Sequence, residues 1–147
     1  MATAHDVAAY VLERSGPITS MKLQKLCYYS QAYHLAWLHR PLFSDPIEAW
    51  TNGPVIRNLW NAHRGQYIVH AIPGGEIARV GSDERRVIDS VLAAFGGLTG
   101  KQLSDRTHSE APWLKYYDGD DARPNEVISH QDLESFYSNP TAMTHSS

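Results

Sequence analysis

The sequence predicts a mainly α-helical fold: a compact single domain around a central apolar helix at about residues 20–39, with short extended segments elsewhere. The chain has 147 residues, a length that suits one domain with one hydrophobic core. Apolar residues recur at helical spacing in several stretches. Most of these stretches begin at a residue type that caps helices and end at Gly or Pro, which indicates helices of ordinary length.

The strongest helical pattern runs from Thr19 to about His39. Thr19 or Ser20 can cap its start. One face of this helix carries Leu23, Leu26, Cys27, Ser30, His34, Trp37 and Leu38. A second face adds Met21, Tyr28 and Leu35. Because a helix that is apolar on more than one side is usually enclosed by its neighbours, we place it at the centre of the fold.

The remaining elements follow from turn and capping residues. A first helix is expected between Thr3, which can form a capping box with Asp6, and Gly16. A short extended piece at 47–50 precedes a turn, and Pro54 is expected in the first turn of a helix that ends near residue 65. Residues 66–82 are interpreted as a mobile loop with short strands at 67–69 and 77–80. Later helices are expected from caps at Ser82 or Asp83, Thr99 and Ser129, and residues 109–112 are expected to open a further turn.

Composition bears on the cellular setting and the partners. The net charge is -3 with scattered Lys and Arg, so the basic face of a nucleic-acid-binding domain is not expected. No apolar run is long enough to span a membrane, and the N-terminal residues do not resemble a signal peptide. Cys27 is the one cysteine, which suits a reducing compartment. A cytoplasmic protein is therefore expected.

A search for catalytic or metal-binding patterns favours none of them. Cys27 with His34 or His108 could form a nucleophile–base pair, but Cys27 lies on the apolar stripe, where cysteine behaves as a small hydrophobe. The eight His residues lack the spacing of a metal site, and no phosphate-binding loop is present, so no metal or cofactor is expected. Residues 107–113 form the most site-like string, interpreted as a junction between helices.

Four strings of the sequence together resemble a known family. They are residues 18–32 (ITSMKLQKLCYYSQA), 41–43 (PLF), 47–55 (IEAWTNGPV) and 103–113 (LSDRTHSEAPW). In order and spacing they resemble the Panacea domain of SocA-like antitoxins, a domain also found in phage-associated proteins. The resemblance implies a compact, mainly helical Panacea domain, placed at 1–138. Residues 139–147, at the end of the chain, are expected to form a frayed tail.

The resemblance also implies a function. It implies a non-enzymatic antitoxin of a type II toxin–antitoxin pair, which neutralises a cognate protein toxin, encoded by the adjacent gene, through direct binding. Two alternatives stay open within this reading: an adaptor that delivers the toxin to a protease, and a phage accessory protein. A small hydrolase that uses Cys27 is the alternative from another class. Some family members carry a further N-terminal DNA-binding domain; this chain starts close to the Panacea domain, so regulation through DNA is not expected.

A protein-binding module needs aromatic anchors within a polar surface, and an adaptable loop lets it fit its partner. On this basis the residues expected to contact the partner are Lys22, Lys25, Trp50, Gln66, Tyr67 and Arg79. For Lys25 and Trp50, a role in holding the fold together is the slightly favoured alternative.

Overall fold

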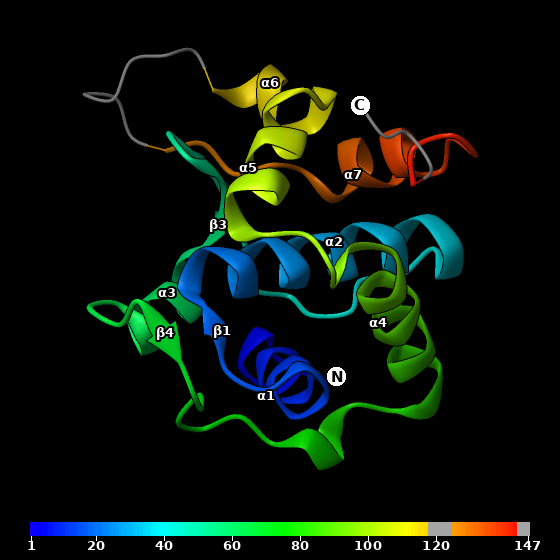
Figure 1. Ribbon diagram of the computed structural model, residues 1–147. Helices are drawn as coiled ribbons and strands as arrows, with labels where there is room; N and C mark the ends of the chain where they lie inside the picture. Colours follow the sequence, from blue (N-terminus) through cyan, green and yellow to red (C-terminus); the bar gives the residue numbers. More distant parts are fainter. Residues whose placement is uncertain (118–124, 144–147) are drawn as a thin grey trace.

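One central helix is surrounded by the others. The computed structural model describes residues 1–117 and 125–143. Helix α2 (Ser20–Leu38) packs against α1 (Ala4–Ser15), α4 (Ser82–Phe95), α5 (Gly100–His108) and α7 (His130–Tyr137). In Figure 1, α1 lies on one side of α2, α5 and α7 lie on the opposite side, and α4 closes the end. The predicted helical fold around a central helix is confirmed.

Burial shows why α2 carries apolar residues on more than one face. Every residue from Leu23 to Ala36 is buried. Thr19 caps the helix by accepting from the Lys22 backbone N–H at 3.2 Å, and the helix ends at His39, whose backbone is left-handed with a φ of 58°. Polar side chains on an enclosed helix need internal partners. Gln31, for example, donates to the Phe43 carbonyl at 2.6 Å.

The segment after α2 forms a β-hairpin. Strands β2 (Ile47–Trp50) and β3 (Gly53–Ile56) pair antiparallel, with Trp50 opposite Gly53. The prediction that Pro54 opens a helix was therefore wrong: Pro54 lies in β3, and α3 (Arg57–His63) begins after the strand. The cause is local and tertiary, because Gly53 has a φ of 115°, which a helix does not accept, and side chains of α2 bind the β3 backbone.

Residues 66–82 cross the surface next to α1. Strand β4 (Ile68–Val69) pairs with β1 (Ile18–Thr19), so the strand predicted at 67–69 is confirmed to within one residue. The strand predicted at 77–80 was wrong, because Ile77–Arg79 form the 3-10 turn η1. Arg85 fixes this turn by donating to the carbonyls of Ile77 and Val80. Arg85 lies on α4, outside residues 77–80. The sequence of residues 77–80 alone therefore gave no sign of its hydrogen bonds to this turn.

Tyrosines join the central helix to the C-terminal half. The Tyr28 and Tyr137 hydroxyls lie 2.8 Å apart. Tyr29 and Tyr137 each donate to the same carboxylate oxygen of Glu110, at 2.8 and 2.7 Å. Glu110 is the N-cap of α6 (Ala111–Tyr116) and is itself buried. These bonds connect α2, α6 and α7 in the core.

The segment that follows α7 lies against α5. Arg106 donates through Nη2 to the carbonyls of Ala142, at 2.7 Å, and Met143, at 3.2 Å, and Ala142 is buried. Ala142 and Met143 thus contact the domain within the segment 139–147, for which a frayed tail is expected; residues 144–147 lie outside the described residues.

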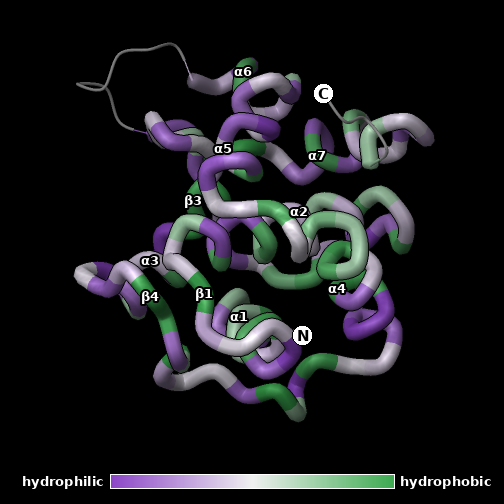
Figure 2. Tube along the Cα trace, viewed as in Figure 1, coloured by the Kyte–Doolittle hydropathy of each residue, from purple (hydrophilic) through white to green (hydrophobic). Residues whose placement is uncertain are grey.

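Hydropathy follows this arrangement. Figure 2 shows hydrophobic stretches of α1, α2 and α4 where these helices meet, and hydrophilic stretches along the outside of α5. Within residues 1–117 and 125–143, the helices are too short or too polar to cross a membrane.

Candidate partner-binding cleft

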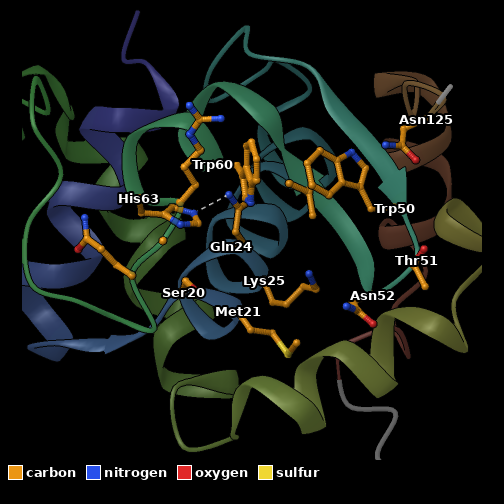
Figure 3. A pocket seen from close by; sticks show the side chains of 14 residues that line it. Ser20, Met21, Gln24, Lys25, Trp50, Thr51, Asn52, Trp60, His63 and Asn125 are labelled. Carbon is orange, nitrogen blue, oxygen red and sulfur yellow. Dashed lines mark hydrogen bonds between the residues drawn. The ribbon is translucent and has the colours of Figure 1, made fainter. Parts of the chain in front are cut away.

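A cleft opens between the start of α2, the β2–β3 turn and the end of α3 (Figure 3). Its volume is about 490 Å³, within the usual range of ligand pockets. It is lined by Ser20, Met21, Gln24, Lys25, Trp50, Thr51, Asn52, Val55, Trp60, His63, Arg64, Gly65, Gln66 and Asn125.

Two tryptophans form one wall of the cleft. The rings of Trp50, from β2, and Trp60, from α3, meet edge to face with 5.4 Å between centroids. Arg57 lies over the Trp50 ring and Arg64 over the Trp60 ring, at 5.0 and 5.5 Å from the centroids. Both rings are half-buried, so they are held in place and still reach the surface. Fixed, partly exposed aromatic rings are typical anchors of protein interfaces.

The floor of the cleft is formed by α2 and is tied to the hairpin. Gln24 accepts from the Ile56 backbone N–H at 2.8 Å and donates to the Ile56 carbonyl at 3.2 Å. The Gln24 amide therefore pairs with the backbone N–H and C=O of Ile56 at the unpaired edge of β3, as the backbone of a neighbouring strand would. Gln24 Nε2 also lies 3.0 Å from Nε2 of His63. The hairpin and α3 are thereby fixed against α2.

Lys25 lies at the centre of this floor. Its side chain is buried, with 2% of its surface exposed, and Nζ donates to the Pro54 carbonyl at 3.0 Å. No carboxylate pairs with it within residues 1–117 and 125–143. Burial without a counter-charge lowers the pKa of Lys25 from 10.5 to about 8. The ammonium group therefore remains protonated at neutral pH, at a cost in desolvation.

Gly53 makes the close approach of Lys25 possible. A Cβ at this position would lie 2.8 Å from Lys25 Cε and 2.8 Å from Thr107 Oγ1. With its φ of 115°, the position also strains any residue other than Gly.

His63, the last residue of α3, also lines the cleft. The residue is 3% exposed, and burial lowers its pKa below 6.5, so it is neutral at pH 7. Its Nδ1 has no hydrogen-bond partner in the described part of the chain.

Four of the six expected contact residues lie in the cleft or directly beside it. Lys25, Trp50 and Gln66 line the cleft, and Tyr67 follows Gln66 with 78% of its surface exposed. The fold-supporting role considered for Lys25 is also present, through its bond to Pro54.

The other two expected residues lie elsewhere. Lys22 is half-buried and donates to the Gly96 carbonyl at 2.7 Å, beside a second depression that it lines with Ile18 and Asp89. Arg79 is exposed on η1 and does not line the cleft.

Sequence reasoning missed Gln24, Trp60, His63 and Arg64. Trp60 carried a usable signal, because tryptophan is a common anchor of protein interfaces. Gln24 and His63 carried no such signal, because they contact each other across 39 positions of the sequence.

Cys27 and residues 107–113, which were considered as possible catalytic groups, make contacts that support the fold. Cys27 is fully buried, and this burial raises the pKa of its thiol, which opposes formation of a nucleophilic thiolate. In the 107–113 string, Trp113 donates through Nε1 to the Trp50 carbonyl at 2.7 Å, and the tilted rings of His108 and Trp113 have centroids 4.3 Å apart. These contacts agree with a junction between helices. Among the described residues, no group of three or more His, Cys, Asp or Glu could hold a metal ion.

Fold and cleft together define a small helical domain with a preformed, aromatic and cationic recess. Comparison with known proteins gives its family. The family described as "Antitoxin SocA-like, Panacea domain" matches residues 23–114. The chain therefore belongs to the SocA-like antitoxin family and contains its Panacea domain. Membership supports an antitoxin role.

One curated relative is Antitoxin SocA of Caulobacter vibrioides (strain NA1000 / CB15N). It is 29% identical over 127 residues, an alignment that covers 75% of this chain and 68% of the relative. No solved structure shows significant similarity to the chain.

Proposed function

We propose that this chain is the antitoxin of a type II toxin–antitoxin pair, which acts in the cytoplasm by binding a cognate protein toxin encoded beside it. The observation that carries the proposal is the family match over residues 23–114. That range includes all residues of the cleft except Ser20, Met21 and Asn125.

The surface around the cleft suits binding to a protein. Trp50 and Trp60 are held rigidly by packing and cation–π contacts, so little side-chain entropy is lost when a partner covers them. Tyr67 and Ile68 continue the exposed apolar surface beyond the rim. The described chain exposes 7320 Å², of which a standard interface would use about 800 Å².

Growth rescue tests the proposal. The adjacent open reading frame is expressed from an inducible promoter in cells with and without this chain. We expect the neighbour to arrest growth, this chain to restore it, and the two proteins to copurify. A harmless neighbour, or an arrest that this chain leaves unchanged, would refute the proposal.

Variants of the cleft connect the rescue to a surface. Trp60→Ala and Tyr67→Ala should weaken rescue, whereas Trp37→Ala is the matched control: its ring is 42% exposed and it does not line the cleft. The half-life of the toxin separates sequestration from delivery to a protease, because sequestration predicts a long-lived complex and delivery predicts faster loss of toxin when this chain is present.

A further inference from the structure

The charge of the cleft differs from that of the chain. The chain has a net charge of -3. The cleft is lined by two cationic side chains, Lys25 and Arg64, and by no Asp or Glu among the described residues. Its remaining polar residues are amides, hydroxyls and neutral His63. An anionic group is therefore the complementary occupant.

Lys25 marks where that anion would be held. An ammonium group has three donors, and the one acceptor that the described structure gives it is the Pro54 carbonyl. Buried charges in proteins are normally paired, because an unpaired charge has lost its hydration without compensation. Lys25 is buried and unpaired in the described structure, and it lines the cleft.

Support of the hairpin alone does not account for a lysine here. The Pro54 carbonyl needs one donor, and a neutral amide would supply it without burying a charge. Gln24, one residue earlier, satisfies the Ile56 backbone in that neutral way. The charge of Lys25 is therefore better explained by something that binds to it.

We propose that the cleft binds an acidic segment of the partner protein, with an Asp or Glu carboxylate accepting a hydrogen bond from Lys25 Nζ and a neighbouring apolar side chain packing on Trp50 and Trp60. In Figure 3, Lys25 lies between Gln24, Met21, Trp50 and Asn52, with the tryptophans above it. The inference rests on the proposed function, because the partner is the toxin encoded beside this chain.

The first test measures affinity for the purified toxin. Lys25→Met should weaken binding by about tenfold or more, the effect of losing a charge-assisted hydrogen bond in an interface. Lys115→Met is the matched control, because Lys115 is exposed and paired with Asp132 on α7, and it should change affinity by about twofold or less. Circular dichroism verifies that both variants are folded.

A second pair of variants leaves the core unchanged. Arg64→Glu places a carboxylate at the exposed rim of the cleft and should also weaken binding. Arg86→Glu makes the same charge change on the outer face of α4, where the Arg86 side chain is 83% exposed, and should bind as the wild type does.

Cross-linking identifies the contact directly. A water-soluble carbodiimide joins an amine to a carboxylate that touches it, forming an amide with net loss of one water. Mass spectrometry of the treated complex should find Lys25 joined to an Asp or Glu of the toxin.

The outcomes separate the two proposals. If the wild-type chain does not bind the toxin, the proposed function fails, and this inference fails with it. If the wild type binds, but folded Lys25→Met and Arg64→Glu bind equally well, the inference alone is overturned. A Lys25 cross-link to a second copy of this chain, in place of the toxin, also overturns it.

Discussion

Replacing Lys25 with methionine gives the sharpest test of how the cleft is built. Desolvation lowers the Lys25 pKa from 10.5 to about 8. At about 1.36 kcal/mol for each pKa unit, this drop corresponds to about 3 kcal/mol by which folding disfavours the charged form. The full cost is present at pH 7, where Lys25 is charged in the folded and in the unfolded chain.

The free energy of unfolding of the wild type should therefore rise with pH through the titration of Lys25. Between pH 8 and 10.5 the unfolded chain binds a proton that the folded chain has released, so the free energy of unfolding rises with pH. A methionine side chain does not titrate, so the wild type should gain about 3 kcal/mol relative to Lys25→Met over this range. At pH 7 the variant should be as stable as the wild type or more stable by up to about 2 kcal/mol, because it removes the buried charge but leaves the Pro54 carbonyl unpaired.

Urea denaturation followed by tryptophan fluorescence, at steps from pH 7 to 10.5, measures this difference. Lys22→Met is the matched control. Lys22 also lies on α2 and donates to a backbone carbonyl, that of Gly96, but its side chain is only half-buried. A stability difference between wild type and Lys25→Met that stays flat across the range would refute the reasoning. An equal step in the Lys22→Met series would refute the assignment of the step to burial.

Three further outcomes are expected. Gly53→Ala should lower the free energy of unfolding by about 2 kcal/mol or more, measured by thermal melting, because its Cβ would overlap the Lys25 stem at a φ that alanine resists. Glu110→Gln should cost about 2–3 kcal/mol in urea denaturation, because the buried carboxylate accepts from Tyr29 and a neutral amide is a weaker acceptor. The free energy of unfolding should fall as the pH drops below 6.5, since burial lowers the pKa of His63 and the unfolded chain binds the proton first; His63→Gln should reduce that loss between pH 7 and 5.5.

Local signals in the sequence were sufficient for most helices. Thr3 with Asp6, and Thr99 with Gln102, form complete capping boxes in the structure. The double-sided apolar pattern of α2 placed it correctly at the centre. Ser82 and Asp83, in contrast, lie inside α4, whose N-cap is Gly81. Capping preferences are statistical, and helix boundaries inferred from them shift by one or two residues.

The hairpin and the cleft show what local signals could not provide. Pro54 is an ordinary residue for a first helical turn, and its place in a strand depends on Lys25 and Gln24, about thirty residues earlier in the chain. Strand β3 is bound along its backbone by side chains of α2, and no local sequence pattern indicates such a contact. Trp50 and Lys25 could be selected as candidates, but their relation to His63 required the folded structure.

The bond between Tyr28 and Tyr137 has a consequence for synthesis. The two residues are 109 positions apart, so α2 leaves the ribosome long before the helix that covers it. A nascent chain that stops short of Tyr137 exposes the apolar side of α2. It also lacks the hydrogen bond that Tyr137 donates to Glu110. Interrupted translation should therefore yield fragments that aggregate or are degraded, and the folded domain would become available only after Tyr137 has been translated.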